Sequence, residues 1–140
     1  MILIDTNVVS ELMRITPAHA VMSWFAEQDS AELYFSAISE AELRTGAAIL
    51  PDGERRDRLT AEIDAMIEED FAGRVFAFGS AAAKSYAAIA AQRRAAGRPI
   101  AEADCQIAAI ARAHGAAVAT RNVRDFEGCG IEVVDPWRVS

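Results

Sequence analysis

Acidic and amide side chains recur along this chain at the ends of predicted strands. Asp5 directly follows the apolar run Ile2–Ile4 and precedes a helical pattern that begins near Val8. In open α/β sheets, ligands bind outside the carboxyl ends of the strands, where the next helices also begin. We expect four further side chains at the same edge of the sheet: Glu42, Asp104, Asn122 and Asp125. The sequence therefore predicts an acidic cluster at one edge of a sheet.

Such a cluster has a chemical consequence. Carboxylates gathered in one cleft repel each other, and the repulsion favours protonation of one of them. A divalent cation removes that conflict. Because the candidate ligands are all oxygen atoms, they favour Mg²⁺ or Mn²⁺ over zinc.

Each candidate also has a purely structural explanation. Asp5 is favourable as a turn residue or as a helix N-cap. Ser39 and Glu42 have the S-x-x-E spacing of a capping box, which predicts a helix opening at Ser39. Asp104 suits the first turn of a helix, although its apolar neighbours predict partial burial and a need for a partner. Two candidates are ordinary turn and loop residues, Asn122 and Asp125. Only the joint arrangement indicates a metal.

Strands and helices alternate along the chain, which predicts an α/β fold with a parallel sheet covered on both faces. Strands are predicted at residues 2–4, 32–36, 74–78, 116–120 and 131–134. After a short first helix, further helices are predicted at residues 18–28, 39–50, 54–70, 80–96 and 102–114. Short loops, with no linker and no internal repeat, predict a single domain over residues 1–140.

The net charge is −7, from 14 basic and 21 acidic side chains. This balance argues against a general polyanion-binding surface, but nucleic acid stays open if negative charge is concentrated at a metal site. Lys84 is the only lysine, and the arginines suit bidentate phosphate contacts. Cys105 and Cys129 lack metal-ligand spacing and are expected to be free thiols in a reducing compartment. Without a signal-like start or an apolar run of ~18 residues, we expect a cytoplasmic protein with no membrane contact.

Other chemistries fit poorly. The two histidines support neither a Ser-His-Asp site nor a zinc site, and phosphate-binding and dinucleotide-binding glycine motifs are absent from the sequence. A phospho-receiver needs a second acid beside Asp5 and a late lysine, whereas Thr6 and Asn7 follow Asp5 and Lys84 lies within a predicted helix. A haloacid-type phosphatase needs an aspartate where Asn7 stands.

Four segments resemble the motifs of PIN-domain proteins of the VapC toxin family. In the family's order they are Ile2–Leu12, Ser39–Gly46, Ile100–Ala109 and Ala119–Phe126, and the ending Val134–Trp137 is similar to the FitB-like branch. The resemblance spans essentially the whole chain. It implies a three-layer α/β/α sandwich with a central, mainly parallel, five-stranded sheet. It also implies an Mg²⁺- or Mn²⁺-dependent ribonuclease toxin and homodimers. The implied partner is a VapB- or FitA-like antitoxin that blocks the active site and binds operator DNA.

The motif match makes Asp5 and Asp104 the principal metal ligands, with Glu42 as a third acid that acts directly or through water. Thr6, Thr120 and Asn122 are expected to hydrogen-bond around them. Many family members carry aspartate where this chain has Asn122, so either Asp125 supplies a fourth carboxylate or a second metal site is weak. The hypothesis is metal-assisted hydrolysis of an RNA phosphodiester. The alternative is a PIN-like scaffold that binds partners without catalysis.

Surface residues give three further expectations. Arginines that are candidates for phosphate contacts, or simply solvated, are Arg44, Arg121 and Arg124. Arginines expected to be solvated at the end of an exposed helix are Arg93, Arg94 and Arg98. An apolar stripe is expected to meet an antitoxin helix or a second protomer, or to be ordinary core: Val8, Val9, Leu12 and Met13.

Overall fold

The computed structural model describes residues 1–138. Five short strands form one sheet in the order β3-β2-β1-β4-β5, and every neighbouring pair is parallel. The strands are β1 (Ile2–Ile4), β2 (Leu33–Ser36), β3 (Val75–Phe76), β4 (Ala117–Ala119) and β5 (Val133–Val134). The first strand of the chain is therefore the central strand of the sheet. Its carboxyl end leads directly to Asp5.

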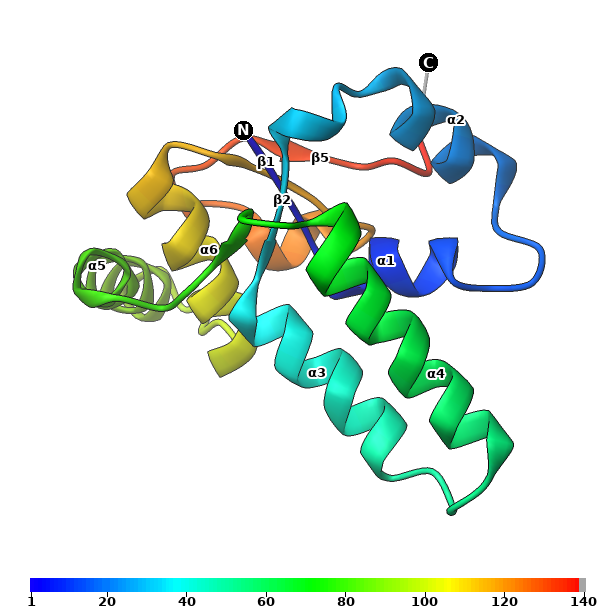
Figure 1. Cartoon of the computed structure of the whole chain (residues 1–140). Helices are drawn as coiled ribbons and strands as arrows, with labels where there is room; N and C mark the ends of the chain where they lie inside the picture. The colour runs from blue at the N-terminus through cyan, green and yellow to red at the C-terminus, as the bar shows by residue number, and fades with distance from the viewer. Residues whose placement is uncertain (139–140) are drawn as a thin grey trace.

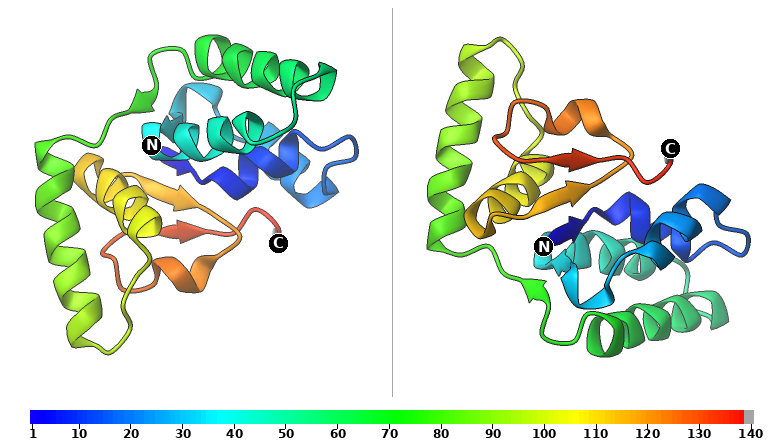
Figure 2. Two further views of the ribbon diagram at one scale, coloured as in Figure 1. Left: turned by 90° about the horizontal axis from the view of Figure 1, so that it is seen from below. Right: turned by 90° about the horizontal axis from the view of Figure 1, so that it is seen from above.

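Helices cover both faces of this sheet (Figures 1 and 2). They are α1 (Thr6–Leu12), α2 (His19–Glu27), α3 (Ala37–Ala48), α4 (Glu54–Ala65), α5 (Ser80–Ala95) and α6 (Glu102–His114). Helices α5 and α6 lie on one side, and α1 to α4 lie on the other. This arrangement is the predicted α/β/α sandwich. No helix within residues 1–138 has both the length and the apolar character needed to cross a membrane.

Neighbouring strand residues belong to two separate cores. Leu3 and Val118 pack with α5 and α6, whereas Ile4 and Ala119 pack with α1 and α2. Successive side chains of a strand point to opposite faces, so an all-apolar strand is buried on both sides. The run Ile2–Ile4 therefore has the two-sided burial that its sequence predicts.

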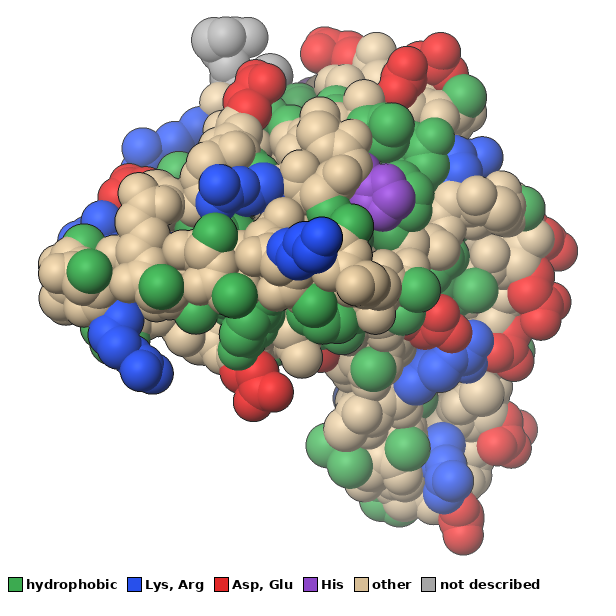
Figure 3. Space-filling model, turned by 90° about the vertical axis from the view of Figure 1, so that its left-hand side faces the viewer, with side chains coloured by type: hydrophobic (Ala, Val, Ile, Leu, Met, Phe, Trp, Pro, Cys, Tyr) green, Lys and Arg blue, Asp and Glu red, His purple; other side chains and the backbone are tan. Residues whose placement is uncertain are grey.

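Helices α3 and α4 form an arm that extends away from the sheet (Figure 1). The arm carries both acidic and basic side chains on its surface (Figure 3). Arg44 joins its two helices, because its guanidinium lies 2.8 Å from Glu40 of α3 and 2.8 Å from Asp64 of α4. This candidate for a phosphate contact is thus already paired with two carboxylates.

The predicted capping box at Ser39 and Glu42 is wrong. Helix α3 begins at Ala37, and the hydroxyl of Ser36 accepts the Ser39 N–H at 3.0 Å. Ser36 is therefore the N-cap, because its side chain satisfies a helix N–H that has no partner within the helix. The buried Ser39 hydroxyl has no hydrogen-bond partner within the described residues. Glu42 therefore has no capping role in α3.

Several predicted bounds are also too long. The strands predicted at 74–78 and 131–134 shorten to two residues each, and both lie at the edges of the sheet. The helix predicted to reach residue 70 is α-helical only to Ala65 and continues as a π-helical turn, Met66–Asp70. Helix α6, by contrast, has the predicted bounds.

Both cysteines are buried free thiols, and burial raises the pKa of Cys105 to about 11.

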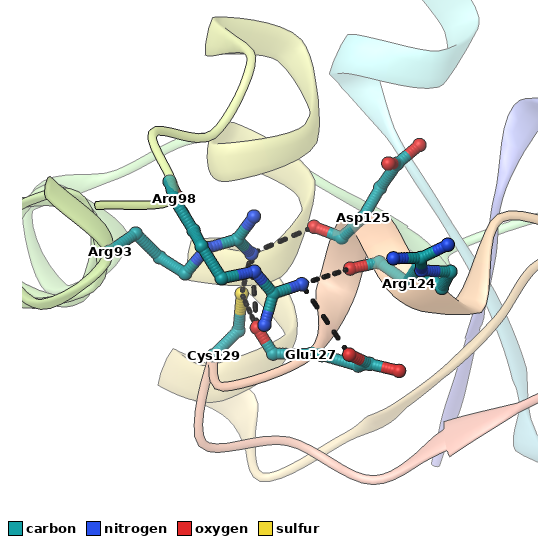
Figure 4. Close-up of polar contacts among 6 residues, drawn as sticks. All are labelled: Arg93, Arg98, Arg124, Asp125, Glu127 and Cys129. Carbon is teal, nitrogen blue, oxygen red and sulfur yellow. Dashed lines mark hydrogen bonds and ion pairs between the residues drawn. The ribbon is translucent and has the colours of Figure 1, made fainter. Parts of the chain in front are cut away.

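The prediction that Arg93 is solvated is wrong, although Arg94 and Arg98 are exposed as predicted. Arg93 is 7% exposed, and its Nε donates to the carbonyl of Arg98 at 2.8 Å. Its Nη1 donates to the carbonyls of Asp125 and Glu127, both at 3.0 Å (Figure 4). Carbonyls in loops lack the regular partners that helices and strands provide. The Arg93 side chain supplies these partners and fixes the segment that follows η3 (Val123–Phe126).

Candidate functional site

Asp5 stands at the junction of β1 and α1. Its backbone N–H donates to the carbonyl of Ala119 at 2.9 Å, and its Oδ1 accepts the Thr6 N–H at 2.8 Å, which caps α1. The structural explanation for Asp5 is therefore correct, but it accounts for only one carboxylate oxygen. The other, Oδ2, accepts hydrogen bonds from Thr120 at 2.8 Å and from the Asn7 amide at 3.2 Å. The side chain is only 5% exposed.

Thr120 and Asn7 tie the end of β4 to the end of β1. The Thr120 hydroxyl, which is fully buried, accepts the Asn122 N–H at 3.0 Å and the Asn7 amide at 3.2 Å. The side-chain oxygen Oδ1 of Asn7 accepts the backbone N–H of Arg121 at 3.2 Å. This network holds Asp5 in one orientation. Sequence reasoning missed the role of Asn7, although its place two residues after Asp5 was a signal.

Glu42 and Asp104 reach the same place from two helices. Glu42 of α3 accepts a hydrogen bond from the Thr6 hydroxyl at 2.7 Å, and Asp104 lies in the first turn of α6. Both line an open hollow of about 550 Å³. Its lining residues are Asp5, Thr6, Asn7, Ser10, Glu11, Arg14, Glu42, Asp104, Arg121, Asn122 and Trp137. We call this space the acidic hollow.

Sequence reasoning did not anticipate two charged residues of the acidic hollow, Glu11 and Arg14. Glu11 is 7% exposed; its Oε2 accepts the Ala18 N–H at 2.8 Å, and Arg14 lies 3.3 Å from its Oε1. This acid ties the end of α1 to the start of α2. The signal was an acidic residue within the apolar helical stripe of α1.

The carboxyl groups of the acidic hollow influence one another. Burial raises the pKa of Asp5, and the charges of Glu42 and Asp125 raise it further, against the lowering effect of hydrogen bonds from Thr120 and Thr6. Burial, followed by the charges of Asp5, Asp125 and Glu42, raises the pKa of Asp104 to about 6. Both shifts reflect negative charge that lacks a counter-charge. A cation bound here would supply one.

Asp125 belongs to the predicted acidic cluster but does not line the acidic hollow. It is exposed on η3 and lines a neighbouring hollow of about 690 Å³. Asn122 is also exposed, and it lines both the acidic hollow and this neighbouring hollow. The first turn of η3 connects these two residues, because the Asp125 backbone N–H donates to the Asn122 backbone carbonyl at 3.0 Å.

The oxygen donors suit a hydrated Mg²⁺ or Mn²⁺ better than a fully protein-bound ion. Within residues 1–138, no group of three or more His, Cys, Asp or Glu side chains is spaced to hold a metal by itself. Mg²⁺ usually keeps several waters and uses only one or two carboxylates. An open hollow with Asp5, Glu42 and Asp104 on its walls fits that coordination. Zinc is bound mostly through cysteine and histidine, and neither residue type lines the acidic hollow within the described residues.

A second, apolar hollow of about 640 Å³ lies near the far end of α1. The apolar stripe of α1 divides between core and surface: Val8 and Val9 are buried, whereas Leu12 and Met13 are half-buried. Leu12 and Met13 line this hollow with Phe25 and Met66. Its charged lining residues are three acids and one arginine: Glu62, Glu69, Asp70 and Arg74. We call this space the apolar groove.

Comparisons with known proteins agree with this fold. The PIN domain family matches residues 2–128. The chain is 44% identical over 137 residues to VapC ribonuclease Y4jK of Sinorhizobium fredii, covering 98% of both proteins. It is 39% identical to Toxin FitB of Neisseria gonorrhoeae, covering 98% of this chain and 99% of that protein.

Solved structures give the same result. FitAB bound to the IR36 DNA fragment has a TM-score of 0.94 at 38% identity, covering 100% of this chain and 98% of that chain. DNA-bound VapBC from Salmonella typhimurium has a TM-score of 0.83 at 26% identity, covering 96% and 97%. From its fold, its motifs and these similarities, this chain belongs to the PIN-domain family and, within it, to the branch that contains the VapC and FitB toxins.

Proposed function

We propose that this chain is an Mg²⁺- or Mn²⁺-dependent endoribonuclease toxin that a cognate antitoxin holds inactive. The observation that carries the proposal is the acidic hollow, where Asp5, Glu42 and Asp104 arrive from three different elements at the carboxyl edge of the sheet. The similarity to a protein named VapC ribonuclease supports RNA as the substrate.

In this mechanism, Asp5 and Asp104 hold the metal. When bound, the cation supplies Lewis acidity and offsets negative charge that develops on the phosphoryl oxygens. Thr120 and the Thr6 N–H fix both oxygens of Asp5, so that its orientation is set before metal or substrate arrives. The Thr6 hydroxyl fixes one oxygen of Glu42. The other oxygen of Glu42 is left to orient the attacking water.

The position of Asp125 favours one metal over two. Asn122 adds no charge to the acidic hollow, and Asp125 lines the neighbouring hollow instead. Asp125 therefore acts through its negative charge, and Asn122 orients a water or the substrate. The scaffold alternative rests on the same uncharged Asn122.

The apolar groove suits the antitoxin. An amphipathic helix binds through an apolar face, and basic residues on its flanks would complement Glu62, Glu69 and Asp70 at the groove. The solved relatives are complexes named FitAB and VapBC, some with DNA. Because this chain has a net charge of −7, we infer that it reaches operator DNA only through the antitoxin.

From the resemblance to the family, we also infer that the chain forms a homodimer. Analytical ultracentrifugation would measure its oligomeric state.

The test is calorimetry with Mg²⁺ and Mn²⁺, followed by RNA cleavage. Asp5→Asn and Asp104→Asn should each abolish metal binding and cleavage while the circular dichroism spectrum stays unchanged. Asp52→Asn is the matched control, because Asp52 lies in the exposed turn between α3 and α4. Metal binding without RNA turnover by the wild type would favour the scaffold. Equal metal binding by wild type and both variants would refute the metal site.

A further inference from the structure

The acidic hollow and its neighbour share one wall. Arg121 and Asn122 line both spaces. The second space, which we call the arginine hollow, is lined by Arg121, Asn122, Val123, Arg124, Asp125, Glu127, Val133, Asp135 and Arg138. A chain-like ligand seated at Asp5 and Asp104 would therefore continue over Arg121 into the arginine hollow.

Arginines interrupt the acidic lining of this path, whose acids are Asp5, Glu11, Glu42, Asp104, Asp125, Glu127 and Asp135. Four of the 14 basic residues line the two hollows: Arg14, Arg121, Arg124 and Arg138. Arg14 pairs with Glu11 at 3.3 Å, and Arg138 lies 3.8 Å from Asp135. Within residues 1–138, no carboxylate lies within 4.0 Å of the Arg121 or Arg124 guanidinium. These two cations are available to an anionic ligand.

Arg121 is held in place from two sides. Its backbone N–H donates to the Asn7 side chain, which also donates to Asp5. Its guanidinium lies over the ring of Trp137, 5.0 Å from the ring centroid. Trp137 in turn packs against the core that contains Ile4, and its backbone N–H donates to the Asp135 carboxylate at 2.9 Å. Ordering an arginine costs side-chain entropy, and stacking on Trp137 supplies that order before a ligand arrives.

We propose that Arg121 and Trp137 form a nucleotide subsite that holds single-stranded RNA next to the cleaved bond. Arg121 binds a backbone phosphate, and the half-buried Trp137 ring offers its accessible part to a base. Arg124 binds the phosphate that follows in the arginine hollow. Aromatic rings that stack bases, beside arginines that bind phosphate, are the usual features of single-strand recognition. This inference rests on the proposed ribonuclease function.

The test is RNA binding without cleavage. Fluorescence anisotropy would follow a fluorescein-labelled, single-stranded RNA of mixed sequence added to the full chain carrying Asp5→Asn. Arg121→Ala in that background should weaken binding about ten-fold. It should also reduce the slope of log Kd against log salt by about 0.7, the value for one lost phosphate contact on a single strand. Arg94→Ala, an equal charge change on the exposed end of α5, should leave both values unchanged.

Trp137 has its own readout. Trp137→Leu should weaken RNA binding about five- to ten-fold with no change in the salt slope, because stacking involves no phosphate charge. Trp137→Phe should restore most of the affinity. A variant that merely destabilised the fold would lower the melting temperature without this rescue. RNA should also quench the fluorescence of Trp137 in a chain whose other tryptophan, Trp24, is replaced by Phe.

The outcomes separate this inference from the function on which it rests. If the parent chain binds RNA and Arg121→Ala behaves like Arg94→Ala, the subsite is wrong and the ribonuclease proposal survives. If the chain carrying Asp5→Asn does not bind RNA, and the wild-type chain does not cleave it, both proposals fail. If Arg121→Ala and Trp137→Leu weaken antitoxin binding but not RNA binding, the surface belongs to the antitoxin, and the subsite is overturned.

Discussion

Replacing Asp104 by asparagine should make the metal-free protein more stable. Asp104 has a folded-state pKa of about 6 against an ordinary value of 3.8, so its charged form is disfavoured in the fold. A carboxyl group with a raised pKa binds its proton more tightly in the folded state. Stability is therefore lost as pH rises from about 4 to above 6. Asparagine has nearly the same shape and carries no charge, so it avoids this loss.

The size of the effect follows from the two pKa values. Their difference of about 2 corresponds to about 3 kcal/mol at most. Because Asp104 is only half-buried, solvent screening reduces this figure by about half. We expect Asp104→Asn to raise the free energy of unfolding by about 1.5 kcal/mol at pH 7.5, and by almost nothing near pH 4.

The assay is urea unfolding in EDTA at pH 4 and pH 7.5, then in excess Mg²⁺ at pH 7.5. Glu102→Gln is the matched control, because this exposed acid occupies the same first turn of α6 and feels the same helix dipole. Mg²⁺ at 100 times its Kd should stabilise the wild type by about 2.7 kcal/mol and leave the variant unchanged, which reverses their order. A wild type that is more stable than Asp104→Asn in EDTA at pH 7.5 would refute the reasoning.

Three further predictions concern the surroundings of the site. Arg93→Met should lower the free energy of unfolding by about 3 kcal/mol, since loop carbonyls lose a charged donor, whereas Arg94→Met should change it by less than about 0.5 kcal/mol in the same denaturation assay. Ser36→Ala should cost about 1 kcal/mol as a lost N-cap, whereas Ser39→Ala should be neutral or stabilising because its buried hydroxyl lacks a partner within the described residues; equal costs in thermal melts would contradict this assignment. Thr120→Val should cost about 1–3 kcal/mol and weaken Mg²⁺ binding in calorimetry, and a serine at the same position should restore both.

The fold was largely predictable because its signals are local. Ile2–Ile4 has no polar residue, and Gly115 ends α6 in the left-handed conformation at φ 66°, where glycine is favoured. The short edge strands β3 and β5 were overestimated, since the apolar residues Ala77, Phe78 and Ile131 resemble strand residues but lie outside the strands. The order of the strands follows from no local pattern and was not predicted.

The candidate site was predictable in part, for a related reason. Its residues stand where strands end or helices begin, which sequence shows, but their partners come from far along the chain. A capping box was offered as the structural alternative for Glu42 because its hydrogen-bond partner, Thr6, lies 36 residues away. Arg93 was assigned to solvent because the carbonyls of Asp125 and Glu127 lie 32 and 34 residues away.

The separation between Asp5 and Thr120 also bears on the order of events during synthesis. Their hydrogen bond joins residues 115 positions apart. At a synthesis rate of ~10 residues per second, roughly ten seconds pass between the addition of Asp5 and the addition of Thr120 to the chain. The central strand β1 has no β4 to pair with until then, and α6 with Asp104 is also among the last elements made. The acidic hollow can therefore form only when synthesis is nearly complete, because a shorter nascent chain lacks the Thr120 hydroxyl that orients Asp5.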